Sequence, residues 1–301
     1  MITALRAGGT MNERNDLAPS DSNEPVSTSL QPMSFVDILD GMFSLYRSHF
    51  QLFFRIVVVY LVFGFLINLI STAVVIGDAS ITSVVITVLA SIVGVLFAYW
   101  IGWGLAYAST QVYLARDITS QVALQRSSRC YLRLLGSMFL YYLVVVCLSI
   151  TIIGIPFAIY FAFRWGLFAF PILFEETTLR NALRRSTELV KGTWWRVCGI
   201  MIAVSLIAFM IAFILQTSYA ILFYSLTGAE RAADLGFLET LRRLFAPSPN
   251  DIGWGLYIIH ALGSLIIGGL TMPIATIGSA LLYFDLRIRK EAYDIEMQVT
   301  D

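Results

Sequence analysis

The side chains that could do chemistry in this sequence are few and widely scattered. The two histidines, His49 and His260, are separated by most of the chain. Glu175 and Glu176 form an adjacent acidic pair, but no further acidic residue or histidine follows at a spacing suited to acid–base catalysis. The sequence contains no Walker A loop and no GxSxG, HExxH or GxGxxG motif. We therefore expect a protein that is not an enzyme and that uses no metal or cofactor.

Arg164 is the most unusual charged residue, because it lies in the middle of an apolar stretch that also contains Pro156 and Pro171. A charge inside a membrane costs at least about 2.5 kcal/mol and marks a functional site by default. Two interpretations stand: Arg164 binds backbone carbonyls within a helix bundle, or it binds an anionic ligand. In both we expect the guanidinium to face the bundle interior, since a mid-span arginine reaches neither interface easily.

Glu175 and Glu176 have a simpler structural explanation than catalysis. Both precede arginines at helical spacing, so we expect ion pairs of the i,i+4 type. The arginines in question are Arg180, Arg184 and Arg185.

Three further polar positions also favour structural roles. We expect His260 to be a hydrogen-bonded residue of the bundle rather than a proton relay. Asp285 and Arg289 are four residues apart, and we expect an exposed pair that contributes about 0.3 to 0.5 kcal/mol. The three cysteines match no metal-binding or disulfide spacing, so we expect small buried apolar residues.

The composition places the whole chain in a membrane. Its residues are 58% hydrophobic and 13% charged, and the mean hydropathy is +0.77. A soluble protein this apolar could not cover its surface, whereas a membrane span needs roughly 20 apolar residues. The net charge of zero argues against nucleic acid as a partner. Six segments are long and apolar enough to cross, and they predict an all-α polytopic bundle: about 53–76, 81–113, 134–153, 155–174, 197–222 and 254–284.

The distribution of arginine predicts the orientation of the six spans. The segments after the second, fourth and sixth spans are rich in arginine, whereas the turns at 77–80 and 151–156 contain no Lys or Arg. The positive-inside rule therefore predicts that both termini are cytoplasmic. The loop before the sixth span is an exception, because it contains Arg231, Arg242 and Arg243 beside acidic residues. Leucines such as Leu238 and Leu244 suggest a short interfacial helix there.

Two domains are expected, a disordered tail over residues 1–32 and a membrane domain over 33–301; Met1 and Met11 are alternative starts. Residues 34–47 predict an amphipathic surface helix with Ser34 as its N-cap. Similar segments start near Val122 and Asn181, and both contain the motif Ala-Leu-x-Arg-Ser. The pattern predicts three helix-plus-hairpin repeats, although shared membrane composition is an alternative explanation.

The sequence also resembles a bacterial membrane family. The matching segments are Phe163-Arg-Trp through Pro171, Glu175-Glu176, Ala182-Leu-Arg-Arg-Ser, Glu188-Leu-Val-Lys-Gly, Trp194-Trp-Arg and the ending Leu281 to Asp294. Over residues 35–296 the chain resembles the membrane domain fused to some glycerophosphodiester phosphodiesterases, and related stand-alone proteins. In the fused enzymes a separate soluble barrel performs hydrolysis with catalytic histidines and metal-binding carboxylates. We do not expect that domain here, so the resemblance implies a six-span protein of the bacterial cytoplasmic (inner) membrane without assigned chemistry.

The function expected from these observations is support or organisation of other envelope components by a non-enzymatic bundle. The amphipathic segments favour this interpretation, because they offer surfaces on which partners can dock. The alternative is a permease or a lipid-handling protein that uses Arg164 and the broken helices around it. Membrane lipids are expected partners, together with other membrane or envelope proteins.

Overall fold

The structure is a computed structural model that describes residues 32–300, except for 78–79, 176 and 228–236. The predicted disordered tail therefore lies almost entirely outside the described residues. Throughout the described part the regular elements are helices, and six helical segments are long and apolar enough to cross a membrane. They are α2 (Phe50–Gly77), α3 (Ile81–Tyr113), α4 (Ser120–Ser149), α5 with α6 (Gly154–Trp165 and Ala169–Glu175), α8 (Trp194–Thr227) and α11 (Trp254–Thr300). The predicted all-α polytopic bundle is confirmed.

Shorter helices connect these spans. The first, α1 (Phe35–Ser48), begins where Ser34 and Asp37 form a capping box. The Ser34 hydroxyl accepts from the Asp37 N–H at 3.2 Å, and the Asp37 carboxylate accepts from the Ser34 N–H at 2.7 Å. The predicted amphipathic helix and its cap are confirmed, because Ile38 and Met42 are buried on one face. The other short helices are α7 (Leu179–Val190), α9 (Phe237–Phe245) and α10 (Pro249–Ile252).

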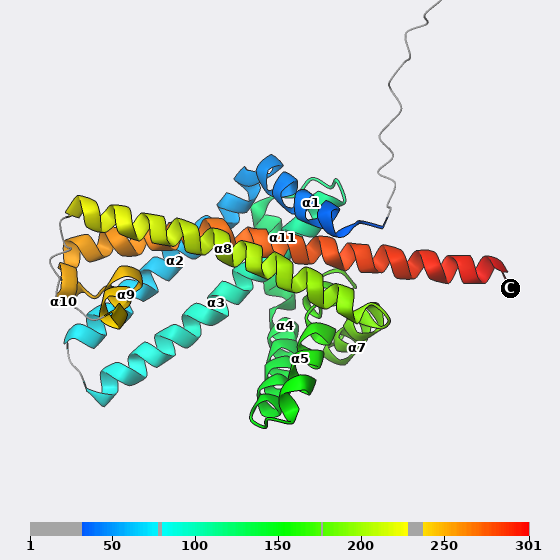
Figure 1. The fold of residues 1–301 in the computed structure, drawn as a ribbon, viewed down its shortest axis with the longest axis horizontal. Coiled ribbons are helices and arrows are strands. Elements are labelled where there is room, and N and C mark those ends of the chain that lie inside the picture. The colour runs from blue at the N-terminus through cyan, green and yellow to red at the C-terminus, as the bar shows by residue number, and fades with distance from the viewer. Residues whose placement is uncertain (1–31, 78–79, 176, 228–236, 301) are drawn as a thin grey trace, which may run out of the picture. The chain divides into compact units, whose positions relative to one another are not determined.

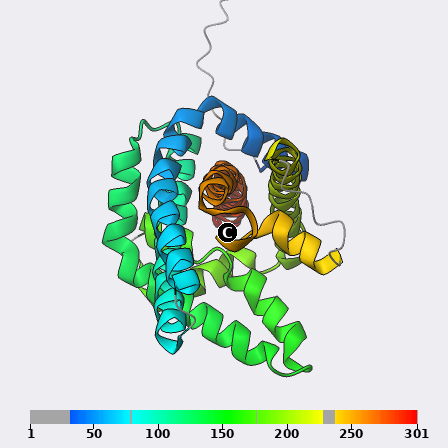
Figure 2. The ribbon, with the colours of Figure 1, turned by 90° about the vertical axis from the view of Figure 1, so that its left-hand side faces the viewer.

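Helix α11 is the centre of the arrangement. It contacts α1, α2, α3 and α8, and Figure 2 shows α2 and α8 on opposite sides of it. In Figure 1 the α4–α5 hairpin runs in a different direction from α2, α3, α8 and α11. The helix α11 continues through Pro273 without interruption.

The buried apolar core lies mainly at one end of the bundle. We call this end of the bundle the basic end. It is formed by α1, α7, the N-terminal part of α4 and the C-terminal part of α11. Ile38, Leu134 and Ile277 are fully buried there, whereas the middles of α2 and α3 expose most of their side chains. Such exposure suits helices that face lipid, because lipid tails are as apolar as leucine. The opposite end bears α9 and α10, and α9 confirms the predicted short helix in that loop.

The two Ala-Leu-x-Arg-Ser motifs occupy equivalent places, which gives the predicted repeat a physical basis. The fully buried Ser127 donates to the carbonyl of Trp100 on α3, at 2.8 Å. The fully buried Ser186 donates to the carbonyl of Arg164 on α5, at 2.9 Å. Each serine thus ties its segment to the preceding span. In the second unit the segment that starts near Val122 is the N-terminal part of the continuous helix α4.

The fourth span is broken near its middle. The helix α5 ends at Trp165, and α6 begins at Ala169 after a turn around Gly166. A Cβ on Gly166 would lie 2.8 Å from Met201 of α8, so the turn and α8 approach closely. Arg126 of α4 donates from Nε and Nη2 to the Leu173 carbonyl of α6, at 3.1 and 2.9 Å. An arginine thereby supports the C-terminal part of α6, a contact that no local sequence pattern indicates.

Candidate functional site

One carboxylate, Asp285 of α11, is fully buried at the basic end. Arg289 donates from Nε to both carboxylate oxygens at 2.9 and 3.1 Å, and Arg196 of α8 donates to Oδ2 at 2.9 Å. The Met33 N–H donates to Oδ1 at 2.8 Å. The Met33 carbonyl in turn accepts from both arginines, at 2.7 Å each. These four residues form a closed set of hydrogen bonds, which we call the Asp285 network.

The carboxylate of the Asp285 network is enclosed by its hydrogen-bond partners. Its carboxylate has 0% side-chain exposure and already binds two guanidinium groups and a backbone N–H. Charge-assisted hydrogen bonds of this kind are among the stronger ones in proteins. The predicted Asp285–Arg289 pair is confirmed, but the prediction that it is exposed is wrong. The segment before α1 and the start of α8 cover it, and both lie far from Asp285 in the sequence.

A second charged group, which we call the Asp251 cluster, lies at the opposite end. Arg242 donates to both oxygens of Asp251, at 3.1 and 3.0 Å, and to Glu239 at 2.7 Å. Arg243 pairs with Glu239 at 3.2 Å and approaches Asp251 at 3.8 Å. The Ser248 N–H donates to Asp251 at 2.8 Å. These bonds join α9 to α10.

The charges of the Asp251 cluster shift the pKa values of its members. Hydrogen bonds from Arg242 and Arg243 lower the pKa of Glu239 to about 2. Burial raises the pKa of Asp251, but hydrogen bonds from Ser248 and Arg242 outweigh it, so that this pKa lies below its ordinary value. The pKa of Arg242 is raised by its bonds to the two carboxylates. All of these groups are therefore charged at neutral pH.

Glu175, at the end of α6, contacts two other helices. Its Oε1 lies 3.6 Å from Nε of Arg185 on α7 and accepts from the Tyr283 hydroxyl of α11 at 3.3 Å. The predicted i,i+4 spacing is wrong for Glu175, because α6 ends there and α7 is a separate helix. Arg184 forms its i,i+4 pair within α7 instead. Glu176 lies outside the described residues.

Arg164 lies in the last turn of α5, and its side chain is half-buried. The guanidinium donates to the Tyr160 hydroxyl one turn earlier and lies 5.3 Å from the centre of that ring. Trp194, at the start of α8, stacks on the ring of Tyr160 with the two ring centres 5.7 Å apart. The guanidinium thus contacts a residue of its own helix, and its predicted direction toward the bundle interior stays a prediction. The break after Trp165 brings the end of α5 beside α7 and the start of α8.

His260 of α11 is buried at the opposite end of the bundle. Its ring lies among aromatic side chains of α8, 5.6 Å from Tyr219, 5.1 Å from Phe223 and 6.3 Å from Tyr224. Within the described part of the chain, Nε2 has no hydrogen-bond partner. The ring also has a hydrogen-bond partner in the backbone of Leu244 of α9, so the predicted hydrogen-bonded role of His260 is confirmed.

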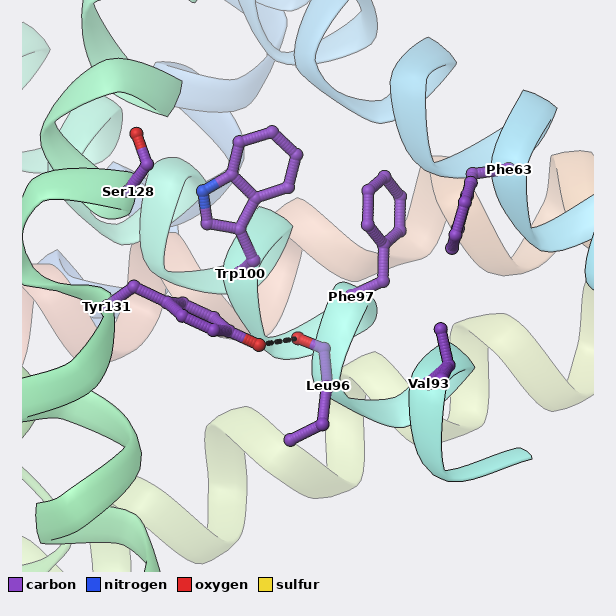
Figure 3. A pocket seen from close by; sticks show the side chains of 7 residues that line it. All are labelled: Phe63, Val93, Leu96, Phe97, Trp100, Ser128 and Tyr131. Carbon is purple, nitrogen blue, oxygen red and sulfur yellow. Dashed lines mark hydrogen bonds between the residues drawn. The ribbon is translucent and has the colours of Figure 1, made fainter. Parts of the chain in front are cut away.

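An apolar groove of about 480 Å³ lies between the α2–α3 hairpin and α4 (Figure 3). Phe63 and Phe97 meet in it with ring centres 4.0 Å apart. The Tyr131 hydroxyl closes one side by donating to the Leu96 carbonyl at 3.1 Å. Figure 3 draws the indole nitrogen of Trp100 on the side of the ring toward Ser128. The remaining lining residue is Val93.

Several groups that organise these sites carry no clear signal in the sequence. In the sequence, Arg196 is one of several arginines in a basic loop, and nothing distinguishes it from the others. The role of Met33 cannot be predicted from its side chain, because it acts through its backbone. In the described ranges no group of three or more His, Cys, Asp or Glu is placed to hold a metal ion. Comparison of the chain with protein-family models, curated proteins and solved structures gave no match. The residues and their geometry therefore have to carry any functional interpretation.

Proposed function

We propose that this chain is a non-enzymatic multi-pass membrane protein that supports or organises other components of a bacterial cell envelope. The Asp285 network is the observation that carries the proposal. At the basic end, a fully buried carboxylate joins α8, α11 and the segment before α1. Such an arrangement suits a rigid platform better than a reaction centre, since reactive groups need access to a substrate.

The same proposal places the basic end in the cytoplasm of a cell with an inner membrane. It is supported by the arginine-rich segments gathered at that end and by the resemblance to the phosphodiesterase-associated membrane family. Reporter fusions test it directly. Fusions after Asp117, Lys191 and Asp301 should report the cytoplasm, and fusions after Asp78 and Pro249 the outer side. The reverse pattern at any of these positions would contradict the topology.

The C-terminal part of α11 is the surface we assign to partner docking. Helix α11 continues beyond Lys290 to Thr300. At about 1.5 Å per residue, this continuation adds about 15 Å. Figure 1 shows the end of α11 running past the other helices.

In-cell cross-linking of the tagged full chain tests this docking role. A chain ended at Ala292 should lose its cross-linked membrane or envelope proteins, while its unfolding temperature stays unchanged because the Asp285 network lies upstream. The control replaces residues 293–301 by glycine and serine at equal length, and should behave like the truncation. An unchanged set of cross-linked proteins in both variants would contradict the proposal.

Lipid handling is a second candidate, and the apolar groove is the observation that favours it. Its volume of about 480 Å³ and its aromatic lining suit part of an acyl chain. A photoactivatable fatty acid should label residues of the groove, and Phe97→Trp should reduce that labelling by filling the space. The matched control is Phe209→Trp, on an exposed face of α8. Equal labelling in both variants would exclude the groove as a lipid site.

A further inference from the structure

A second, polar cavity lies at the corner between α1 and α2. Its volume is about 600 Å³, and α1, α2 and the start of α4 contribute to it. Its lining includes two arginines, a histidine, several hydroxyl or amide side chains and no carboxylate: Arg47, Ser48, His49, Phe50, Gln51, Leu52, Arg55, Ile118, Thr119 and Ser120. We call it the Arg47–Arg55 cavity. It is separate from both the Asp285 network and the apolar groove.

The two arginines of this cavity differ from those of the charged networks. Arg196, Arg289 and Arg242 each bind a carboxylate within the protein. Arg47 and Arg55 make no ion pair or hydrogen bond to any described residue, and both are exposed. Two guanidinium groups at one cavity attract an anion, and their fork geometry matches a phosphate in particular.

An apolar ridge leads from the cavity along α2. Its side chains are all exposed and recur every four residues: Phe50, Phe54, Val58, Val62, Leu66 and Ile70. Rows at this spacing follow a helix at a small inclination to its axis. From Phe50 to Ile70 the row is about 30 Å long, which is about the thickness of the hydrocarbon core. A ligand at this place therefore meets cationic groups at one end and a long apolar surface beyond it.

We propose that the Arg47–Arg55 cavity binds the headgroup phosphate of an anionic phospholipid. The acyl chains of this lipid follow the ridge from Phe54 toward Val62. The phosphate accepts hydrogen bonds from Arg47 and Arg55, with Thr119 and Ser120 within the same cavity. A soluble phosphate would use the cavity alone, whereas a phospholipid would use both the cavity and the adjoining apolar ridge.

Native mass spectrometry of the full chain in detergent tests this site. The probes are phosphatidylglycerol and phosphatidylethanolamine with identical acyl chains. We expect phosphatidylglycerol to bind more tightly, and the double variant Arg47→Gln, Arg55→Gln to weaken it about tenfold or more, because charge-assisted bonds are lost. The matched control is Arg129→Gln, Arg180→Gln, which removes the same charge from two exposed arginines outside this cavity. In the control we expect a change of about twofold at most.

Three outcomes would overturn the proposal. Equal weakening of phosphatidylglycerol binding by both double variants would show that the lipid responds to the overall positive charge of the basic end and not to this cavity. Displacement of the lipid by inorganic phosphate or glycerol phosphate at similar concentration would show that the ligand is soluble. Equal binding of the two lipids would show that the site does not select an anionic headgroup over a zwitterionic one. The variant Arg47→Lys, Arg55→Lys keeps the charge and should give intermediate binding, so the site stays testable if the glutamine variant does not fold.

Discussion

Asp285 and Asp251 are bound in the same way, yet they do different things for the fold. Each accepts from one backbone N–H, and each lies beside two arginines. The partners of Asp251 all lie within the short stretch from Arg242 to Ser248, whereas Met33 is 252 residues from Asp285. The bonds of Asp285 therefore join distant parts of the chain, whereas the bonds of Asp251 hold the shape of a single loop.

Exposure separates the two sites further. The Asp285 side chain is 0% exposed, and that of Asp251 is 12% exposed. The difference is also present in the arginines, because Arg196 is 30% and Arg242 42% exposed. Water and salt weaken the interactions of exposed charges, whereas a buried charge that loses its partner costs several kcal/mol. The same chemistry should therefore contribute far more to stability at the basic end.

The variant Asp285→Asn should have the largest effect. Asparagine keeps the shape and the bond from Met33, but it leaves Arg196 and Arg289 without a counter-charge. We expect the free energy of unfolding to fall by about 2 to 4 kcal/mol, somewhat below the range for fully buried pairs because both arginines are partly exposed. Denaturant unfolding in detergent measures it. Asp251→Asn is the matched control, and an equal fall in both variants would refute the comparison.

Helix packing at the basic end provides the next test. It shows whether close contacts between helices stabilise this end in addition to the ion pairs of Asp285. A Cβ on Gly278 would lie 2.5 Å from Val204 Cγ1 and 3.0 Å from the Met42 sulfur. Gly278→Ala should therefore cost about 1 to 3 kcal/mol through overpacking. A Cβ on Gly268 of the same helix would meet no atom within 4 Å, so Gly268→Ala should be neutral or slightly stabilising. Similar losses in both would show a general intolerance of α11 rather than a tight contact.

Arg289→Lys should have a smaller effect on stability, and it tests whether Met33 is held in place by the Asp285 network. Arg289 bridges the carboxylate and the Met33 carbonyl, which a single ammonium group cannot reproduce with the same geometry. We expect a loss of about 1 kcal/mol, the size of one net hydrogen bond. Hydrogen exchange should also become faster in the peptide that contains Met33. Unchanged exchange there, with stability lowered, would show that Met33 is held by other contacts.

Features that depend on neighbours along the chain can be predicted from the sequence. The second span is predicted at 81–113, and α3 has these bounds. The capping box at Ser34 can also be read directly, because both partners lie within one turn. The pair Asp285–Arg289 belongs to the same class, since four residues on a helix are always close.

Features that depend on distant contacts cannot be read in this way. The burial of Asp285 depends on its contacts with Arg196 and with the backbone of Met33, and no local sequence pattern predicts either contact. The surroundings of Arg164 are a related case: the residue lies at the centre of an apolar run, but the helix breaks after Trp165. The count of apolar residues gives the length of a span, whereas the depth of a residue depends on where the helix breaks.

Glu239 should give the smallest effect and the clearest dependence on pH. Its pKa is lowered to about 2 in the folded protein from an ordinary value of 4.5. A lowered folded pKa means that the contribution to stability is fully present above the ordinary value and is lost as the pH falls through the folded one. The difference in Tm between the natural chain and Glu239→Gln should therefore be small and constant above pH 4.5. It should shrink toward zero near pH 2 and also decrease with added salt, because these charges are exposed. A difference that persists at about pH 2 would mean that Glu239 acts through packing, and the Asp251 cluster would then resemble the Asp285 network more than its exposure indicates.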